Sequence, residues 1–218
     1  MFNRREVVTA GAQIVSMLGL SGAAVAGEAT MIRRAIPSSG EQLPVIGLGT
    51  SGPFEVGAST SARAPLRDVL QAFLEGGGRL IDTSPMYSTA EGVLGDLLSA
   101  EMQKQVFMAT KVWTNGEAAG VAQMTESGRR LRHQPLDLVQ VHNLRDLAVQ
   151  LKTLRQWQEQ KRVRYIGITH YTVAAQAEIA AIVAREKLDF VQFNYSATSP
   201  EAEQRLSLIH ISEPTRPY

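Results

Sequence analysis

From about residue 43 onward, the chain alternates between short apolar runs and longer stretches of mixed polarity. Each apolar run is almost continuously hydrophobic, which is typical of a strand that is buried on both faces of a parallel sheet. The runs cover residues 43–49, 79–84, 106–112, 136–142, 164–170 and 189–195. This pattern predicts six parallel strands.

The stretches between these runs repeat apolar residues at positions i, i+3 and i+4, the spacing of a helix with one buried face. They include Pro65–Glu75, Glu117–Leu131, Leu147–Gln160 and Val173–Arg185. Repeated strand–helix units suit either a doubly wound sheet or a closed barrel. Ahead of the first unit, MIRRAI and EQLPV flank the turn-forming Ser38, Ser39 and Gly40, which predicts a hairpin that would plug the bottom of a barrel.

Composition narrows the class of partner. The 218 residues include 22 Lys and Arg against 21 Asp and Glu, for a formal net charge of +1, and 44% are hydrophobic. This balance lacks the basic surface that nucleic acids or anionic membranes require, so we expect a small-molecule partner. The absence of cysteine excludes disulfides, thiolate catalysis and a cysteine-based zinc site.

The first 29 residues have the layout of a cleaved export signal. Arg4 and Arg5 precede an apolar run over residues 7–20, and the small residues 24–26 suit a cleavage site. The run is shorter than the roughly 20 apolar residues of a membrane-spanning helix. The paired arginines resemble a twin-arginine signal, although Val7 stands where a phenylalanine is usual. We therefore predict a periplasmic protein that is not in the membrane once mature. If the segment is only an amphipathic helix, the protein would be cytoplasmic.

Three polar residues of different chemistry close successive apolar runs. Asp82, Lys111 and His142 each stand at the carboxyl end of a predicted strand. In a parallel barrel that end carries the catalytic groups. Each residue alone has an ordinary structural explanation, as a cap, a solvated strand end or a loop histidine. Their recurrence at equivalent positions favours a shared site.

Tyr87 follows Asp82 in the loop DTSPMYSTAEGVLG and would be presented at the same face. An isolated tyrosine there is more often a packing group, but an adjacent ammonium group gives it a chemical role. A phenol is a weak acid at neutral pH, and an ammonium group stabilises the phenolate that remains after proton transfer. Asp82 would hold Lys111 charged and oriented. His142 would then donate a hydrogen bond to a substrate carbonyl group and polarise it.

In this order, these motifs resemble the aldo-keto reductase family over roughly residues 31–206. The similar segments are LPVIGLGTSGPF, GGGRLIDTSPMYSTAEGVLGDLL, FMATKVW, LDLVQVHN, YIGITHY and FVQFNYS. The resemblance implies an α/β fold, the (β/α)8 TIM barrel, of which about the first six βα units and an N-terminal hairpin are present. It also implies reduction of an aldehyde or ketone to an alcohol by hydride from NADPH, with NADH as a possible substitute.

The resemblance assigns roles to the four polar residues. Tyr87 would be the general acid, Lys111 and Asp82 would tune it, and His142 would orient the substrate carbonyl. These four residues are the candidate catalytic group. Asn143, which follows His142, would support them from the same loop.

The resemblance further implies a nicotinamide site. Its candidate residues are Gly49, Thr50, Asp82, Thr169, His170 and Gln192. Gln192 matches a residue that holds the nicotinamide carboxamide, although a polar strand residue also has structural uses. Thr169 and His170 stand where the family often has serine and asparagine. Threonine keeps the hydrogen-bonding hydroxyl, whereas His170 is a departure that we expect to alter the pocket.

The pattern of units stops before a whole barrel of about 250 residues is complete. We predict an incomplete barrel over residues 30–206 and a non-native tail over residues 207–218, in which His210 and Arg216 have no function. A natural short C-terminus is the alternative. Without further strands the sheet edges would be open, and open edges promote aggregation. The literal chain is therefore expected to be poorly soluble and inactive.

Two other functions remain open at this stage. One is a regulatory barrel that binds the cofactor but turns over slowly. The other is a metal-dependent hydrolase that uses His142 and Asp82. Catalytic metal sites usually have three protein ligands, and only these two are offered here, so we predict no metal. The substrate itself cannot be read from the sequence. Phe54 and Trp113 suggest only an apolar pocket wall.

Overall fold

The computed structural model describes residues 31–203 and 206. The predicted export signal (1–29) and the predicted tail (207–218) lie outside the described residues. No helix within the described part is long and apolar enough to cross a membrane.

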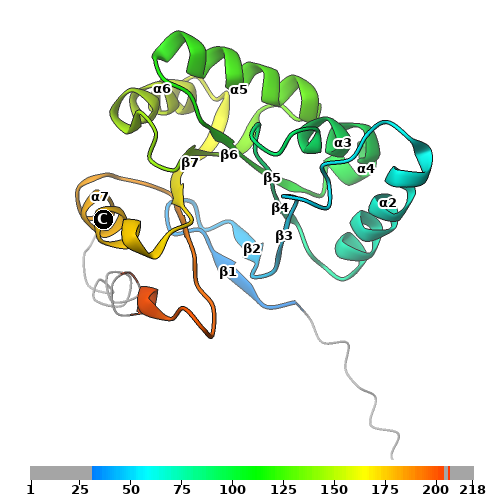
Figure 1. The fold of residues 1–218 in the computed structure, drawn as a ribbon, viewed down its shortest axis with the longest axis horizontal. Helices are drawn as coiled ribbons and strands as arrows, with labels where there is room; N and C mark the ends of the chain where they lie inside the picture. Colours follow the sequence, from blue (N-terminus) through cyan, green and yellow to red (C-terminus); the bar gives the residue numbers. More distant parts are fainter. Residues whose placement is uncertain (1–30, 204–205, 207–218) are drawn as a thin grey trace, which may run out of the picture. The chain divides into compact units, whose positions relative to one another are not determined.

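Six parallel strands form one curved sheet in which each strand pairs with the next one along the chain (Figure 1). The strands are β3 (Gly47–Gly49), β4 (Leu80–Asp82), β5 (Phe107–Val112), β6 (Leu136–His142), β7 (Val163–His170) and β8 (Phe190–Phe193). A doubly wound sheet reverses its strand order at one point, whereas a barrel adds strands in sequence. The observed order confirms the prediction of a (β/α)8 barrel represented by six consecutive units.

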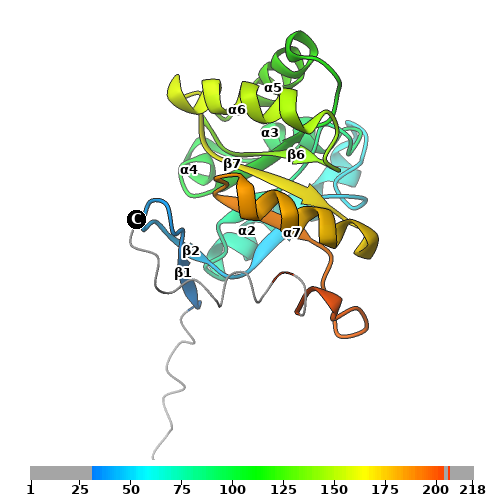
Figure 2. The same ribbon diagram turned by 90° about the vertical axis from the view of Figure 1, so that its left-hand side faces the viewer.

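The helices lie on the outer side of this sheet, and α5 and α6 run side by side along it (Figure 2). The helices are α2 (Thr60–Glu75), α3 (Ala90–Leu97), α4 (Ala100–Gln103), α5 (Glu117–Leu131), α6 (Leu147–Glu159) and α7 (Gln176–Arg185), with a 3-10 turn η1 (Val173–Ala175) before α7. Outward strand residues such as Met108, Val139 and Ile168 are fully buried beneath them. This outer layer is the main hydrophobic core.

The prediction of a single strand over residues 43–49 was wrong. The run divides between two sheets, because Gln42–Pro44 forms β2, which pairs antiparallel with β1 (Arg33–Ala35), while β3 pairs parallel with β4. Val45 and Ile46 connect the two strands and are 47% and 55% exposed. An apolar run therefore does not by itself show how many sheets it enters.

Helix α2 begins at Thr60, five residues before the predicted start at Pro65. Ser59 caps it, since its side chain accepts a hydrogen bond from the Ala62 N–H. Proline is favoured in the first turn of a helix, so Pro65 was a reasonable marker of the start. Here the serine cap outweighs it, and Pro65 lies inside the helix.

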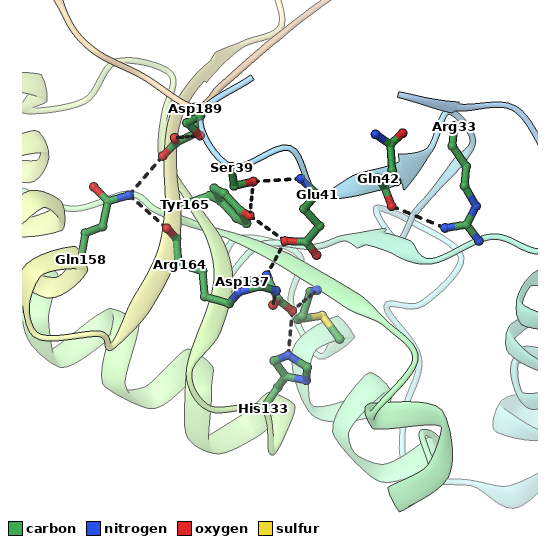
Figure 3. Close-up of polar contacts among 12 residues, drawn as sticks. Arg33, Ser39, Glu41, Gln42, His133, Asp137, Gln158, Arg164, Tyr165 and Asp189 are labelled. Atoms are coloured by element: carbon green, nitrogen blue, oxygen red, sulfur yellow. Dashed lines mark hydrogen bonds and ion pairs between the residues drawn. The ribbon is translucent and has the colours of Figure 1, made fainter. Parts of the chain in front are cut away.

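The hairpin β1–β2 lies against the amino-terminal ends of the strands, as the sequence predicted. Ile36 is 4% exposed and packs among inward-facing residues that include Phe107 and Tyr165. Polar contacts fix the hairpin in place (Figure 3). Ser39 Oγ lies 2.7 Å from Tyr165 Oη, and Glu41 accepts hydrogen bonds from Tyr165 and Arg164. The carboxyl ends of the strands are left free for the site.

Candidate active site

The carboxyl ends of β3 and β4 are tied together at Asp82. Gly49 pairs in register with Asp82. The next residue, Thr50, is fully buried, and both its N–H and its hydroxyl donate to the Asp82 carbonyl, each at 3.1 Å. The predicted cofactor-contacting turn of Gly49 and Thr50 therefore lies directly beside Asp82.

Lys111, at the end of β5, is 2% exposed and makes the central ion pair of the site. Its Nζ donates to Asp82 Oδ2 at 2.7 Å and to the Thr83 carbonyl at 2.8 Å. The same Nζ lies 5.0 Å from the centre of the Tyr87 ring. The buried ammonium group is thus balanced by Asp82 and placed against the tyrosine, as the sequence predicted.

The loop that carries Tyr87 is fixed by the start of helix α3. The Tyr87 N–H donates to Ser84 O, and Tyr87 O accepts from Ala90 N–H at the first helical residue. The next residue, buried Glu91, accepts a 2.7 Å hydrogen bond from the Thr110 hydroxyl of β5. Burial raises the pKa of Glu91 above its ordinary value. Glu91 therefore links the tyrosine loop to the strand that bears Lys111, a contact that the sequence analysis missed.

His142, at the end of β6, completes the group. Its ring stands perpendicular to the Tyr87 ring, with 6.3 Å between ring centres. Burial, together with the positive charges of Lys111 and His170, lowers the pKa of His142 to about 4. The imidazole is therefore neutral at neutral pH and has one N–H to donate.

Ser84 is the hydrogen-bond partner of one ring nitrogen of His142. Ser84 Oγ lies 3.3 Å from His142 Nδ1 and accepts a hydrogen bond from the Met86 N–H. The Ser84 hydroxyl has one proton to donate and a second lone pair, so it can bond Nδ1 in either tautomer. When Ser84 donates to Nδ1, the imidazole proton is on Nε2. Ser84 was not singled out from the sequence, although it lies two residues after Asp82.

The next two strands extend the site in register. His142 pairs with Thr169 of β7, and Thr169 pairs with Gln192 of β8. Gln192 Nε2 donates to Asp82 Oδ2 at 3.3 Å, and its Oε1 accepts from Gln140 Nε2 at 3.2 Å. Gln192 thus connects the Asp82–Lys111 ion pair to Thr169, another residue predicted to contact the nicotinamide.

Gln140 is a third residue that the sequence analysis missed. It is 3% exposed, and besides Gln192 it reaches Asp82 Oδ1 at 3.5 Å. Alternation along LDLVQVH puts Gln140 on the same face as His142, so strand periodicity was the signal that could have found it.

Comparison with known proteins agrees with this geometry. A model of the aldo/keto reductase family matches residues 45–209. The chain belongs to the aldo-keto reductase family. Methylglyoxal reductase YeaE of Escherichia coli (strain K12) is 30% identical over 156 residues, which are 68% of this chain and 54% of that protein. The chain thus spans about half the length of this curated relative.

Solved aldo-keto reductases share the fold at lower identity. An aldo-keto reductase from Klebsiella pneumoniae in complex with NADPH matches with a TM-score of 0.70 and 24% identity, over 84% of this chain and 65% of that one. AKR11C1 from Bacillus halodurans, in its holo form, matches with a TM-score of 0.69 and 21% identity, over 83% of this chain and 63% of that one.

In this aldo-keto reductase, His170 makes its contacts within its own loop. Its Nδ1 accepts a 3.2 Å hydrogen bond from the Thr172 N–H, and its ring stacks on exposed Tyr171. It is close enough to His142 to help lower the pKa of that residue. The departure from the usual asparagine therefore places a second imidazole ring near His142.

The inner face of this aldo-keto reductase sheet holds a cavity of about 300 Å³. It is lined by Leu80, Asp82, Ala109, Leu138, Gln140 and residues 190–193. Of the two predicted pocket-wall residues, Phe54 is 2% exposed and belongs to the outer core. Trp113 is half-buried in the loop after β5, beneath Arg145. Of the two, only Trp113 keeps part of its side chain exposed.

Within residues 31–203 and 206, no three histidine, aspartate or glutamate side chains gather where a metal ion could bind. The carboxylate of Asp82 is taken up by Lys111. The hydrolase alternative would need both Asp82 and His142 as metal ligands, so the geometry gives it no support.

Proposed function

We propose that this chain carries the carbonyl-reducing site of an NADPH-dependent oxidoreductase that converts an aldehyde or ketone to an alcohol. The observation that carries the proposal is the position of Lys111 Nζ, bonded to Asp82 and 5.0 Å from the Tyr87 ring. The relative that is named a methylglyoxal reductase supports a small carbonyl compound as substrate.

The residues fit a nicotinamide carboxamide group. Gln192 is exposed at the end of β8, and only one of its two amide hydrogens is used by Asp82. Thr169 lies beside it in register and brings a hydroxyl group. An amide donor and a hydroxyl together match the oxygen and nitrogen of a carboxamide. When bound, the cofactor would supply the hydride.

Side chains of this chain would transfer the proton that the carbonyl oxygen receives. Tyr87 would donate its phenolic proton to the carbonyl oxygen, and Lys111 would stabilise the phenolate that remains. Asp82 keeps the ammonium group charged and in place. His142, neutral and protonated on Nε2, would donate a hydrogen bond to the same carbonyl oxygen and orient it.

The test is Tyr87→Phe, which keeps the ring and removes the proton. We expect the rate of NADPH oxidation with methylglyoxal to fall by about 10²- to 10⁴-fold, the usual contribution of a general acid. NADPH affinity, measured by fluorescence titration, should be unchanged. Tyr195→Phe is the matched control, because that tyrosine is 58% exposed and bonds only Glu203 among the described residues.

A binding barrel without fast turnover is the second candidate, and stopped-flow single turnover separates the two. Rapid oxidation of bound NADPH in the wild type, lost in Tyr87→Phe, supports the reductase. Equal and slow oxidation in both proteins, with NADPH still bound, would favour the binding role.

A further inference from the structure

Two loops follow the carboxyl ends of the strands that carry Lys111 and His142. The loop after β5 covers residues 113–116, and the loop after β6 covers residues 143–146. Arg145 connects them: its guanidinium carbon lies 4.2 Å from the centre of the Trp113 ring, and its Nε donates to Asn115 Oδ1 at 2.9 Å. The guanidinium group therefore lies over an indole ring and is fixed at one nitrogen.

The backbone of the second loop is strained. Asn143, Leu144 and Asp146 have φ angles of 53°, 55° and 48°. These angles lie in the left-handed region, which residues other than glycine rarely adopt. Such residues persist only where the surroundings hold them, and they gather at functional sites. Asn143 and Leu144 precede Arg145 and Asp146 follows it, so the unusual backbone on both sides sets where Arg145 points.

Hydrogen bonds between the loops hold this conformation. Asp146 Oδ2 accepts from the Gly116 N–H at 2.7 Å. Gln150, which is fully buried in α6, donates to the carbonyls of Thr114 and Gly116 at 3.3 and 3.1 Å. Both loops therefore form one rigid wall beside the site.

Arg145 has no ion-pair partner on this wall. Within residues 31–203 and 206, no carboxylate lies at ion-pair distance from Arg145, and neither its Nη1 nor its Nη2 donates a hydrogen bond. The charge of Lys111 is already neutralised by Asp82, and Asp146 uses Oδ2 on the loop backbone. Two parallel N–H donors of a rigid guanidinium group remain available.

We propose that Arg145 is an anion-binding residue of the substrate pocket, and that the preferred substrates are aldehydes or ketones that carry a carboxylate. A planar guanidinium group binds a carboxylate through two parallel hydrogen bonds, and a rigid one loses little entropy in doing so. Trp113 would contact the carbon chain between the two ends. This inference rests on the proposed function for the reaction at the carbonyl end.

The experiment compares 4-oxobutanoate with butanal, two aldehydes of equal chain length of which only the first carries a carboxylate. In the wild type we expect a higher kcat/KM for 4-oxobutanoate. Arg145→Gln should lower that value by about 10- to 100-fold, the usual range for a charge-assisted hydrogen bond, and leave butanal nearly unchanged. For Arg145→Lys, the kcat/KM for 4-oxobutanoate should lie between those of the wild type and Arg145→Gln. Lysine keeps the positive charge but lacks the two parallel N–H donors of arginine.

The matched control is Arg162→Gln. Arg162 stacks on Trp157, 3.7 Å from the ring centre, before β7 begins and thus at the opposite end of the sheet. Its loss should leave the ratio of the two substrates unchanged. Equal losses for both substrates in Arg145→Gln would mean that Arg145 only supports the loops, and would overturn the proposal, as would an unchanged ratio.

Binding separates this inference from the proposed reaction. If neither aldehyde is reduced, the proposed function fails, and the subsite is then read from the tryptophan fluorescence during titration with butanoate and with butanamide. Tighter binding of butanoate that disappears in Arg145→Gln supports the subsite. The absence of any preference for butanoate overturns it.

Discussion

His142 is a histidine whose surroundings favour its neutral form. An unfolded chain binds a proton at this residue near pH 6.5, whereas the folded protein does so only near pH 4. Between these values the unfolded state binds more protons, so the free energy of unfolding falls as the pH is lowered. For one group the slope is at most about 1.4 kcal/mol per pH unit.

We therefore expect the wild type to lose more stability than His142→Gln between pH 6.5 and pH 4.5. Urea unfolding at several pH values, followed by circular dichroism, measures the difference. The other titrating groups are present in both proteins, so their contributions to the pH dependence cancel in the comparison. Parallel curves for the two proteins would show that His142 takes up its proton equally in both states.

The residues of the site were predictable from the sequence to different degrees. Asp82, Lys111 and His142 were found because strand ends are marked by the change from apolar to polar residues. Gln140 was missed because its side chain forms hydrogen bonds inside the sheet, and an isolated polar residue within an apolar strand gives no sign of its partner. The role of Arg145 depends on the contact between two loops, which no local pattern encodes.

At the scale of elements, helix α3 positions the tyrosine loop through one closely packed face. Glu91 and Gly95 are one helical turn apart, and Glu91 bonds β5 while Gly95 lies against the backbone of α5. A Cβ at Gly95 would lie 1.9 Å from the Arg130 carbonyl oxygen. Only glycine allows the two helices to approach this closely.

Gly95→Ala should therefore destabilise the fold by roughly 1–3 kcal/mol, the usual cost of overpacking. Gly92→Ala, in the same helix, is the control, because nothing lies within 4 Å of its added Cβ. Alanine is the better helix former, so this variant should gain up to about 1 kcal/mol. Thermal unfolding compares them, and equal melting temperatures would mean that α3 moves away from α5 at little cost.

Helices and strands were predicted correctly where all residues of one apolar run belong to a single helix or a single sheet. The bounds of α5 and β6 agree with the sequence pattern, since each has a single buried environment and clear turn residues at its ends. The run over residues 43–49 failed because its two halves pair with different sheets. Partner choice is a long-range property, so the hydrophobic pattern records burial but not pairing.

At the scale of the whole molecule, the sheet is strongest in its middle. Strands β4 to β7 pair on both sides, and β4 is the shortest of them, whereas β3 and β8 each pair on one side only within the described residues. Amide hydrogen exchange follows such differences, because edge strands open locally more readily. We expect the slowest exchange in β5–β7 and faster exchange in β3 and β8.

Hydrogen exchange with mass spectrometry of the full chain measures this directly. Protection of β3 or β8 as strong as that of β6 would contradict the expectation. In that case those strands have a further partner, such as another segment or a second copy, along their outer edge.

The strand order also bears on how such a protein can change through recombination. The four residues proposed for proton transfer lie on β4–β6 and their loops, between residues 82 and 142, while Thr169 and Gln192, proposed for the cofactor, come later. A single crossover between β6 and β7 would therefore exchange the strands of Thr169 and Gln192 and leave the other four residues intact. Under the proposed function, the two sets of residues can thus be inherited from different parents.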